Sequence, residues 1–182
     1  MTSHDRVPPG QTATAKWPVL TYGDVPQIDT ARWRFRIWGA VESPRQWTWV
    51  EISALPVVES QSDIHCVTRW SRLDNHWRGV RPRDLLAAAR PRPEARYVMV
   101  HAEPDYTTNL PLEALLDDDV ILATHHDGRP LAAAAGGTSV AVKSIVGAER
   151  LRRGARSAGP GVVRLSDMHI SSANRLDPAG RK

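Results

Sequence analysis

The sequence predicts a single β-rich domain of the α+β class. Its clearest strand signal lies at residues 32–38, where apolar side chains alternate with three arginines. A period of two is typical of a strand that buries one face. The predicted helices are short and irregularly placed, which excludes a doubly wound sheet. The pair Asp127-Gly128 indicates a hairpin turn, and 182 residues are enough for one ordinary domain.

The first part of the chain combines extended runs with one short helical turn. In chain order we expect an irregular segment over 1–16, a strand over 32–38, an extended run over 47–49 and a helical turn over 51–55. The first segment is expected to be irregular because Pro8, Pro9 and Gly10 break regular structure. Pro56 stops the helical turn, since it cannot continue the hydrogen-bond pattern.

The part from residue 57 to residue 131 continues to mix strands with short helices. In order we expect a strand over 57–67, a polar loop over 69–81, a helix over 82–89, a strand over 96–102, a loop over 106–111, a helix over 112–116 and a strand over 119–123. Pro82 suits the first helical position, where the N–H that proline lacks would have no partner. Beyond Leu131 only residues 139–146 predict a further strand.

Aromatic side chains and charges are unevenly distributed along the chain. All seven Trp, all three Tyr and the single Phe lie between Trp17 and Tyr106. Residues 143–182 hold nine basic and three acidic side chains, a net charge of +6, whereas the whole chain carries +4 and residues 1–142 therefore −2. Residues 150–182 are rich in Arg, Gly, Ala and Ser and have no sustained apolar face. This composition predicts a basic, disordered tail.

Several protein classes are excluded by simple counts. The single cysteine, Cys66, permits no internal disulfide and no zinc module built from several cysteines. No apolar run approaches the roughly 18 residues of a membrane-spanning helix. Residues 1–11 are polar and contain neither an apolar stretch nor a twin-arginine pair of an export signal. We therefore expect a cytoplasmic chain that does not contact a membrane.

Cys66 is the first candidate for chemistry. A lone cysteine is more commonly a small buried apolar side chain. Here His65 precedes it, and Arg69 and Arg72 follow it at the end of a predicted strand, where cationic neighbours favour the thiolate. A thiolate beside arginines suits either covalent catalysis or ligation of a soft metal, with the arginines placed to bind an anion. The residues themselves leave both readings open.

The segment around Cys66 also carries a specific pattern. It runs Asp63-Ile-His-Cys66-Val-Thr-Arg-Trp70-Ser71 and then Asp74-Asn75-His-Trp77-Arg-Gly79-Val80-Arg-Pro-Arg-Asp84-Leu85-Leu86. This pattern resembles the core of the sulfite oxidase-like molybdopterin-binding domain, the fold shared by sulfite oxidases and the catalytic subunit of the protein-methionine-sulfoxide reductase. Supporting pieces flank it: Val7–Gln11, Trp17–Leu20, Tyr22-Gly23, Trp33–Gly39, Tyr106–Leu112 and Asp127–Leu131. The resemblance is nearly continuous from residue 7 to residue 131 and is greatest to short, single-domain bacterial members.

This resemblance implies a molybdenum cofactor with a single pyranopterin and a two-electron transfer of an oxygen atom. Cys66 would be the one protein thiolate on molybdenum, with the other sulfurs supplied by the pterin dithiolene. Arg69 would bind an anionic substrate or the pterin phosphate, so Cys66 and Arg69 are the implied catalytic residues. The implied cofactor contacts are His65, Cys66, Thr68, Tyr106 and Thr107. The last two stand in for a family threonine whose hydroxyl Ala102 cannot supply.

Other conspicuous side chains receive structural roles. We expect Trp70 and Trp77 to pack in the core rather than line a pocket. The run His125-His126-Asp127 resembles a metal-binding spacing. However, adjacent residues of a strand point to opposite faces of the sheet and make poor joint ligands. We therefore assign no metal to this run.

The family pattern changes between Gly137 and Lys143. Gly136-Gly137 and Lys143–Glu149 match a turn and a closing strand of the family, but only residues 138–142 separate them. An arginine-bearing strand and an aromatic-lysine loop that hold the pterin phosphate are missing there. Without such donors a phosphate loses charge-assisted hydrogen bonds worth about 1.5–3 kcal/mol each. Cofactor retention is therefore open, as is whether residues 132–182 reflect a deletion or a frame disturbance.

The expected organisation is an irregular segment over 1–16, a shortened molybdopterin-binding domain over 17–149 and a disordered basic tail over 150–182. The leading function is a molybdenum-dependent oxidoreductase that acts on a small oxo-anion or oxo-acceptor and exchanges electrons with an unknown partner. One alternative is a non-catalytic remnant of that fold. The other is a binder of an acidic partner or nucleic acid through the tail, which has no aromatic ring to stack on bases, so nucleic acid is not the expected partner.

Overall fold

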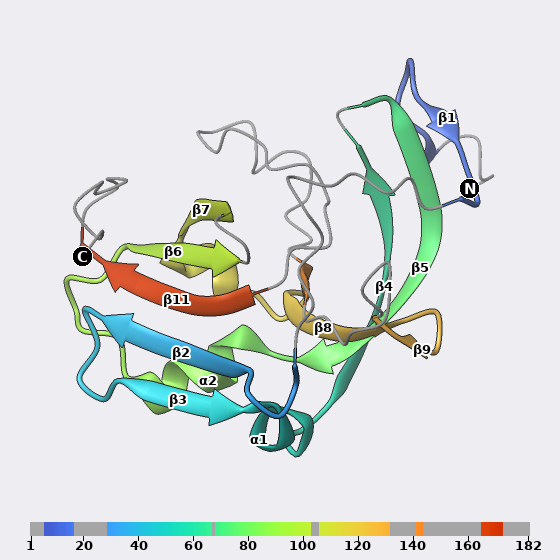
Figure 1. Cartoon of the computed structure of the whole chain (residues 1–182). Coiled ribbons are helices and arrows are strands. Elements are labelled where there is room, and N and C mark those ends of the chain that lie inside the picture. The colour runs from blue at the N-terminus through green and yellow to red at the C-terminus, as the bar shows by residue number, and fades with distance from the viewer. Residues whose placement is uncertain are drawn as a thin grey trace.

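The computed structural model describes residues 6–16, 29–66, 68–102, 106–131, 141–143 and 165–172. Their strands form a six-stranded sheet and a five-stranded sheet, which lie beside each other together with a few short helices (Figure 1). This arrangement confirms the β-rich α+β class. Among the described residues no helix is long and apolar enough to cross a bilayer.

The elements have the following bounds. In chain order they are β1 (Thr12–Ala13), β2 (Arg34–Gly39), β3 (Arg45–Thr48), α1 (Trp49–Ser53), β4 (Val58–His65), β5 (Trp70–Val80), α2 (Pro82–Ala89), β6 (Tyr97–Ala102), β7 (Tyr106–Pro111), a 3-10 helix (Leu112–Leu115), β8 (Ile121–His126), β9 (Arg129–Pro130), β10 (Ala141–Lys143) and β11 (Leu165–Ser171). The strand, helix and hairpin predicted around Phe35, Leu85 and Asp127 are confirmed.

The six-stranded sheet is built on a long antiparallel hairpin. β4 pairs with β5 from Val58 opposite Gly79 to His65 opposite Ser71. On its other side β5 pairs with β8 and, at its beginning, with the parallel β1. The hairpin and β1 extend away from the five-stranded sheet (Figure 1). The loop that joins β4 to β5, which contains Cys66, therefore lies at the end of this extension.

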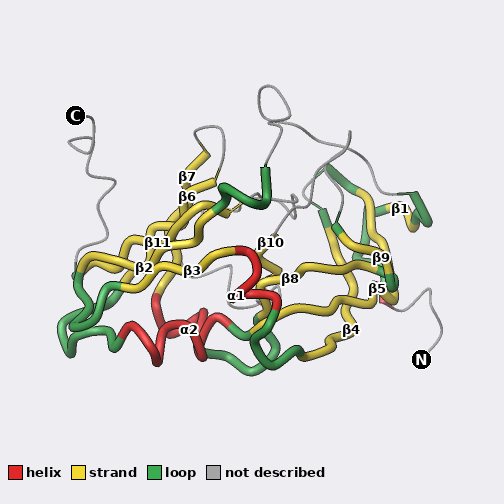
Figure 2. Tube along the Cα trace, turned by 60° about the horizontal axis from the view of Figure 1, so that its bottom comes forward, coloured by secondary structure: helices red, strands yellow, loops and turns green. Residues whose placement is uncertain are grey.

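The five-stranded sheet has the order β3-β2-β11-β6-β7. Its central strand, β11, runs parallel to β2 and antiparallel to β6. One face of the sheet is apolar, and α2 runs beneath it (Figure 2). Fully buried core side chains come from β2 (Phe35, Ile37), α2 (Leu85, Leu86) and β11 (Met168, Ile170). Val80 and Leu122 of the other sheet belong to the same core cluster, so both sheets contribute to this core.

The prediction of a polar loop over residues 69–81 is wrong, because Trp70–Val80 form β5. Asn75, Trp77 and Gly79 are buried, whereas the residues between them are exposed. This alternation has the period of a strand. The number of charged side chains in the segment concealed it from a reading based on polarity.

Two other predictions of irregular structure are also wrong. Residues 106–111 form the strand β7, which pairs with β6 along its length. It is the edge strand of its sheet, so it does not need the apolar alternation that marks central strands. Thr12 and Ala13, predicted as part of an irregular segment, pair with Trp70 and Ser71 as β1.

The prediction of a disordered tail over 150–182 is wrong for Leu165–Ser171, which form β11. Of the strand's described side chains, two apolar ones are buried, Met168 and Ile170. Two such residues are too few to stand out in a basic segment. The rest of that predicted tail, and the shortened segment before Ala141, lie outside the described residues, as does the interpretation of residues 132–182 as a deletion or frame disturbance.

Candidate functional site

The β4–β5 loop fixes the backbone of Cys66 at both of its polar groups. The Cys66 N–H donates to the carbonyl oxygen of Trp70 at 2.8 Å, and the Cys66 carbonyl oxygen accepts from the N–H of Arg69 at 3.0 Å. A second donor, Gln11 Nε2, reaches the same carbonyl oxygen at 3.3 Å. With both flanking peptide groups held, the position of the sulfur depends mainly on a single side-chain torsion.

The Cys66 side chain is buried, with 1% of the residue exposed. Its Sγ lies 3.1 Å from Thr68 Oγ1, which follows it on the same loop. A hydroxyl can donate to a thiolate, and such a bond to a charged acceptor is stronger than one between neutral groups. Either atom can be the donor when Cys66 is a thiol, whereas a thiolate could only accept from Thr68.

Arg69 has a backbone conformation that is uncommon for its residue type. Its φ is 67°, in the left-handed region, which costs a residue with a side chain about 1–2 kcal/mol relative to glycine. Glycine is the usual residue at the left-handed position of a short hairpin loop. The Arg69 side chain is therefore a candidate for a functional role, because strain of this kind gathers at functional sites. The residue is exposed beside the buried cysteine.

A chain of polar side chains leads away from the loop. His65 Nδ1 lies 2.9 Å from Ser71 Oγ, and Ser71 Oγ donates to Gln11 Oε1 at 2.5 Å. Because the serine hydroxyl has only one proton to donate, His65 must carry the proton on Nδ1 and donate it to Ser71. Ser71 is fully buried. His65 was predicted as a site residue, whereas Ser71 and Gln11 were not, although both lie in the segments that carry the family resemblance.

The structure brings four of the predicted site residues together and leaves two apart. Cys66, Thr68 and Arg69 lie on the β4–β5 loop, and His65, the last residue of β4, directly precedes it. Tyr106 and Thr107 lie on β7, where they pair with Ala102 and His101 at the edge of the other sheet. Figures 1 and 2 both show β7 away from the β4–β5 hairpin. A role for Tyr106 and Thr107 in cofactor binding stays a prediction.

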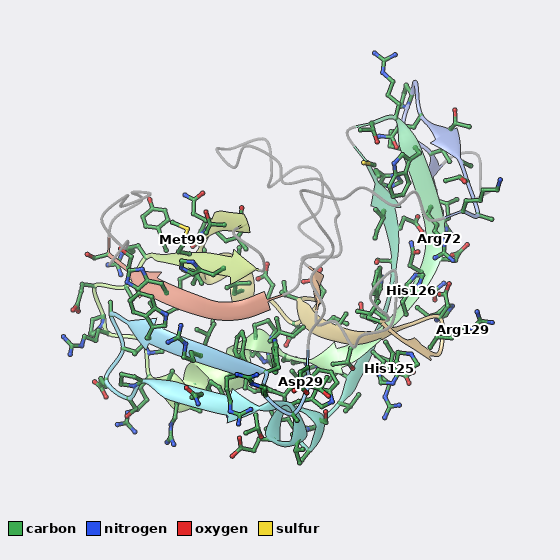
Figure 3. All side chains as sticks on the ribbon, viewed as in Figure 1. Asp29, Arg72, Met99, His125, His126 and Arg129 are labelled. Carbon is green, nitrogen blue, oxygen red and sulfur yellow. The ribbon has the colours of Figure 1, made fainter. Side chains whose placement is uncertain are left out.

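Arg72, expected as a cationic neighbour of Cys66, is directed elsewhere. Its guanidinium contacts Asp127 Oδ2 at 2.5 Å and His126 Nε2 at 2.9 Å, and it also donates to Asn75 Oδ1. Its Nε reaches the carbonyl oxygen of Ala15 at 3.3 Å. Figure 3 shows Arg72 and His126 close to each other on β5 and β8. This cluster connects the segment after β1 to the β8–β9 turn and has a structural role.

The Arg72 cluster sets the electrostatic surroundings of His126. Its Nε2 lies between Arg72 Nη1, which can only donate, and Asn75 Oδ1 at 3.0 Å, which can only accept. Burial lowers the pKa of His126, and the positive charges of Arg72 and His76 act in the same direction, whereas the Asp127 carboxylate opposes them. Burial alone would raise the pKa of Asp127, but hydrogen bonds from Arg72 and from the His76 N–H outweigh it and hold that pKa below its ordinary value. His125 instead bonds Thr124 Oγ1 at 2.9 Å, so the two histidines have separate partners.

A pH dependence of stability follows from the lowered pKa of His126. The unfolded chain takes up this proton below about pH 6.5, whereas the folded chain does not until a lower pH. The free energy of unfolding should therefore fall as the pH falls through about 6.5 towards the folded pKa. His126→Gln keeps an acceptor for Arg72 and cannot titrate, so its unfolding midpoint in urea should depend less on pH between about 5 and 7.5. His125→Gln is the matched control, and equal slopes for the wild type and His126→Gln would contradict the prediction.

Comparison with known proteins decides the family. Residues 22–149 match the oxidoreductase molybdopterin binding domain. The chain belongs to this family. The resemblance around Cys66 is thereby confirmed, and the match continues past Leu131 through the residues that resemble the family's closing strand. The cofactor implied by the family is molybdenum bound to molybdopterin.

Two relatives and one solved structure support the assignment. The chain is 47% identical over 127 residues to the uncharacterised oxidoreductase YuiH of Bacillus subtilis, covering 69% of the chain and 64% of YuiH. It is 32% identical over 114 residues to YedZ1 of Azospira oryzae, which is named as a subunit of a protein-methionine-sulfoxide reductase, covering 62% of the chain and 43% of YedZ1. The fold matches the sulfane dehydrogenase SoxCD from Paracoccus pantotrophus with a TM-score of 0.65 and 18% identity, covering 82% of the chain and 40% of SoxCD. The chain thus spans less than two thirds of each of these proteins.

The donor chemistry around Cys66 fits the cofactor that the family implies. Cys66 supplies one soft sulfur on a loop whose backbone is fixed, and a single thiolate leaves the remaining coordination to ligands that a dithiolene brings. Thr68 stands against that sulfur, and the exposed Arg69 adjoins it. A second arginine, Arg81, has a buried Nε without a hydrogen-bond partner in the described structure. Arg81 follows the end of β5 that is opposite to the Cys66 loop. The strand has eleven residues and rises about 3.3 Å with each of them, so Arg81 does not belong to the Cys66 site.

Proposed function

We propose that this domain holds a single-pyranopterin molybdenum cofactor through Cys66 and serves a two-electron transfer of an oxygen atom to or from a small oxo-acceptor. The observation that supports this most is the fixed backbone of Cys66, whose two polar groups are both hydrogen-bonded within the loop and to Gln11. Such preorganisation is what a metal ligand requires. The cofactor, when bound, supplies the redox chemistry.

The chain's own residues would hold the cofactor, orient the sulfur that binds its metal and select the substrate. Cys66 donates its sulfur, Thr68 Oγ1–H stabilises that sulfur as a thiolate, and Arg69 binds the negative oxygens of an oxo-anion through charge-assisted hydrogen bonds. In the oxidising direction the substrate gains one oxygen from water, and two protons and two electrons are released. The electrons pass to a partner of unknown identity, and the proposed location is the cytoplasm.

The cofactor proposal is tested by molybdenum content. The wild-type chain, expressed in a host that makes the cofactor, should contain close to one molybdenum per chain by elemental analysis. Cys66→Ser keeps the size of the side chain but replaces the soft sulfur, and it should lower that ratio to the background of the host. His125→Gln is the matched control, because His125 bonds Thr124 on β8 and lies outside the Cys66 loop. Equal molybdenum in the wild type and in Cys66→Ser would refute ligation by Cys66, and none in the wild type would favour the non-catalytic remnant.

The anion-binding proposal is tested with Arg69→Gly. Glycine relieves the left-handed backbone, so the variant should fold at least as stably as the wild type and keep its molybdenum. Loss of charge-assisted bonds worth about 1.5–3 kcal/mol should lower kcat/KM for sulfite by about 10-fold to 150-fold. The value for a neutral sulfoxide should change little, because it carries no charge for Arg69 to bind. A similar loss for both substrates would argue against anion recognition, and Arg69→Lys should recover part of the activity on sulfite.

A further inference from the structure

Residues 6–16, which we call the N-terminal strap, cross the base of the Cys66 loop. The N–H of Thr12 donates to the carbonyl oxygen of Arg69 at 3.0 Å, and the N–H of Thr14 donates to that of Ser71 at 2.9 Å. These bonds form the short parallel pairing of β1 with β5. The strap therefore holds the backbone of the loop from the side opposite to β4.

The strap is anchored a second time by Arg6. Its guanidinium forms two hydrogen bonds of 2.9 Å to Asp63 and one of 2.8 Å to Asp74. The bond to Arg6 lowers the pKa of the Asp74 carboxyl. None of these groups touches Cys66, so the Arg6 anchor contributes to the attachment of the strap without reaching the thiol.

Gln11 is the one strap side chain that bonds the backbone of Cys66. Its Nε2 donates to the Cys66 carbonyl oxygen at 3.3 Å, and its Oε1 accepts from the buried hydroxyl of Ser71 at 2.5 Å. The Cys66 carbonyl oxygen can only accept, so it faces the amide nitrogen, and the amide oxygen is then the end that accepts from Ser71. His65 completes the chain behind Ser71.

These contacts determine the geometry of the sulfur. The Cys66 peptide groups are set by Trp70 on one side and by Arg69 and Gln11 on the other. Without the Gln11 bond, the carbonyl oxygen would retain only the N–H of the strained Arg69. The peptide that follows Cys66 could then rotate, and the sulfur would move relative to Thr68. Groups that orient a metal ligand in this way are commonly worth about 10-fold to 100-fold in metal affinity.

We propose that Gln11, held by Ser71, is a positioning residue that sets the orientation of the Cys66 sulfur for its metal. The inference rests on the proposed function for the identity of the metal, but not for the placement of the sulfur. Gln11→Glu tests it with a side chain of the same shape, which can still accept from Ser71 but can no longer donate to Cys66. Ser71→Ala removes the bond that holds the amide oxygen. Arg6→Gln is the control, because it weakens the strap without touching the loop.

The first measurement uses the full chain without cofactor. Because Cys66 is the only cysteine, its S–H stretch gives a single Raman band that reports hydrogen bonding of the thiol. Gln11→Glu and Ser71→Ala should each shift and broaden this band, whereas Arg6→Gln should lower the melting temperature and leave the band unchanged. The double variant of Gln11 and Ser71 should resemble the single variants, since the two residues act as one unit.

The second measurement uses the chain loaded with molybdenum. Gln11→Glu and Ser71→Ala should lower the molybdenum content about 10-fold or more under limiting cofactor and alter the Mo(V) EPR spectrum of what remains. An unchanged S–H band in Gln11→Glu, or an equal change in Arg6→Gln, would overturn the positioning role. If the wild type binds no molybdenum while the band still responds only to Gln11 and Ser71, the proposed function fails and the positioning of the sulfur by Gln11 stands.

Discussion

A chain that ends at Arg164 is expected to be unable to form the five-stranded sheet. The cut removes β11, which lies between β2 and β6 and pairs with both. Met168 and Ile170, both fully buried, would leave the core. Loss of two such side chains costs about 4–10 kcal/mol, before the loss of backbone pairing on both sides is considered. That cost is comparable to the whole stability of an ordinary domain, about 5–15 kcal/mol.

The matched control for this truncation is a chain that ends at Ser172, which keeps all of β11. The control should be recovered as soluble protein and show a cooperative unfolding transition in urea. The shorter chain should be insoluble or lack that transition, and the circular dichroism signal of its β-structure should be reduced. A cooperative transition with an unchanged midpoint in the shorter chain would show that β11 is dispensable.

Gly79→Ala is expected to destabilise the pairing of β5 with β8. A Cβ at this position would lie 2.7 Å from the Leu122 carbonyl carbon and 2.8 Å from Ala123 Cα, and closer still to the Leu122 carbonyl oxygen. All three atoms are backbone, so no side chain can rotate away, and β8 would have to shift. β8 carries the buried Ile121 and Leu122. We expect a loss of at least about 3 kcal/mol in the free energy of unfolding, at the upper end of what overpacking costs.

Gly128→Ala separates this steric effect from the general cost of replacing a glycine. Gly128 lies in the β8–β9 turn with a φ of 75°, and a Cβ there would meet nothing within 4 Å. In that variant the free energy of unfolding should fall by only about 1–2 kcal/mol, the cost of placing a side chain on a left-handed residue. Urea unfolding of both variants gives the comparison. A smaller loss in Gly79→Ala than in Gly128→Ala would show that the close approach of β5 and β8 is not rigid.

The sequence predicts the parts of the fold in which a local pattern and burial agree. The strand around Phe35 and Ile37 alternates strictly, and the helix at Pro82 starts with a residue that favours its first position. β5 was missed because its alternation is carried by Asn75, Trp77 and Gly79, which do not share an apolar character. β7 was missed because it is an edge strand without apolar alternation, although its partner β6 precedes it closely in the chain. β11 was missed because its partners β2 and β6 lie far away in the chain and local propensity does not mark it as a strand.

The candidate site could be predicted in so far as its residues are neighbours in the chain. His65, Cys66, Thr68 and Arg69 lie together simply because they share one loop. Gln11 approaches this loop only through the pairing of β1 with β5, which two exposed residues do not reveal. The role expected for Arg72 was wrong for a related reason. Its partner Asp127 lies in the turn between β8 and β9, so nearness to Cys66 in the sequence did not determine its contacts.

The central place of β11 also governs when this domain can finish folding during synthesis. β2 leaves the ribosome early, yet its parallel neighbour in the sheet is β11, with residues 40–164 between them. Contacts this distant in the chain form slowly and only after both partners exist. Until β11 has emerged, the edges of β2 and β6 stay open to wrong pairing with other chains. The nascent domain is therefore expected to need protection against aggregation until β11 has been synthesised.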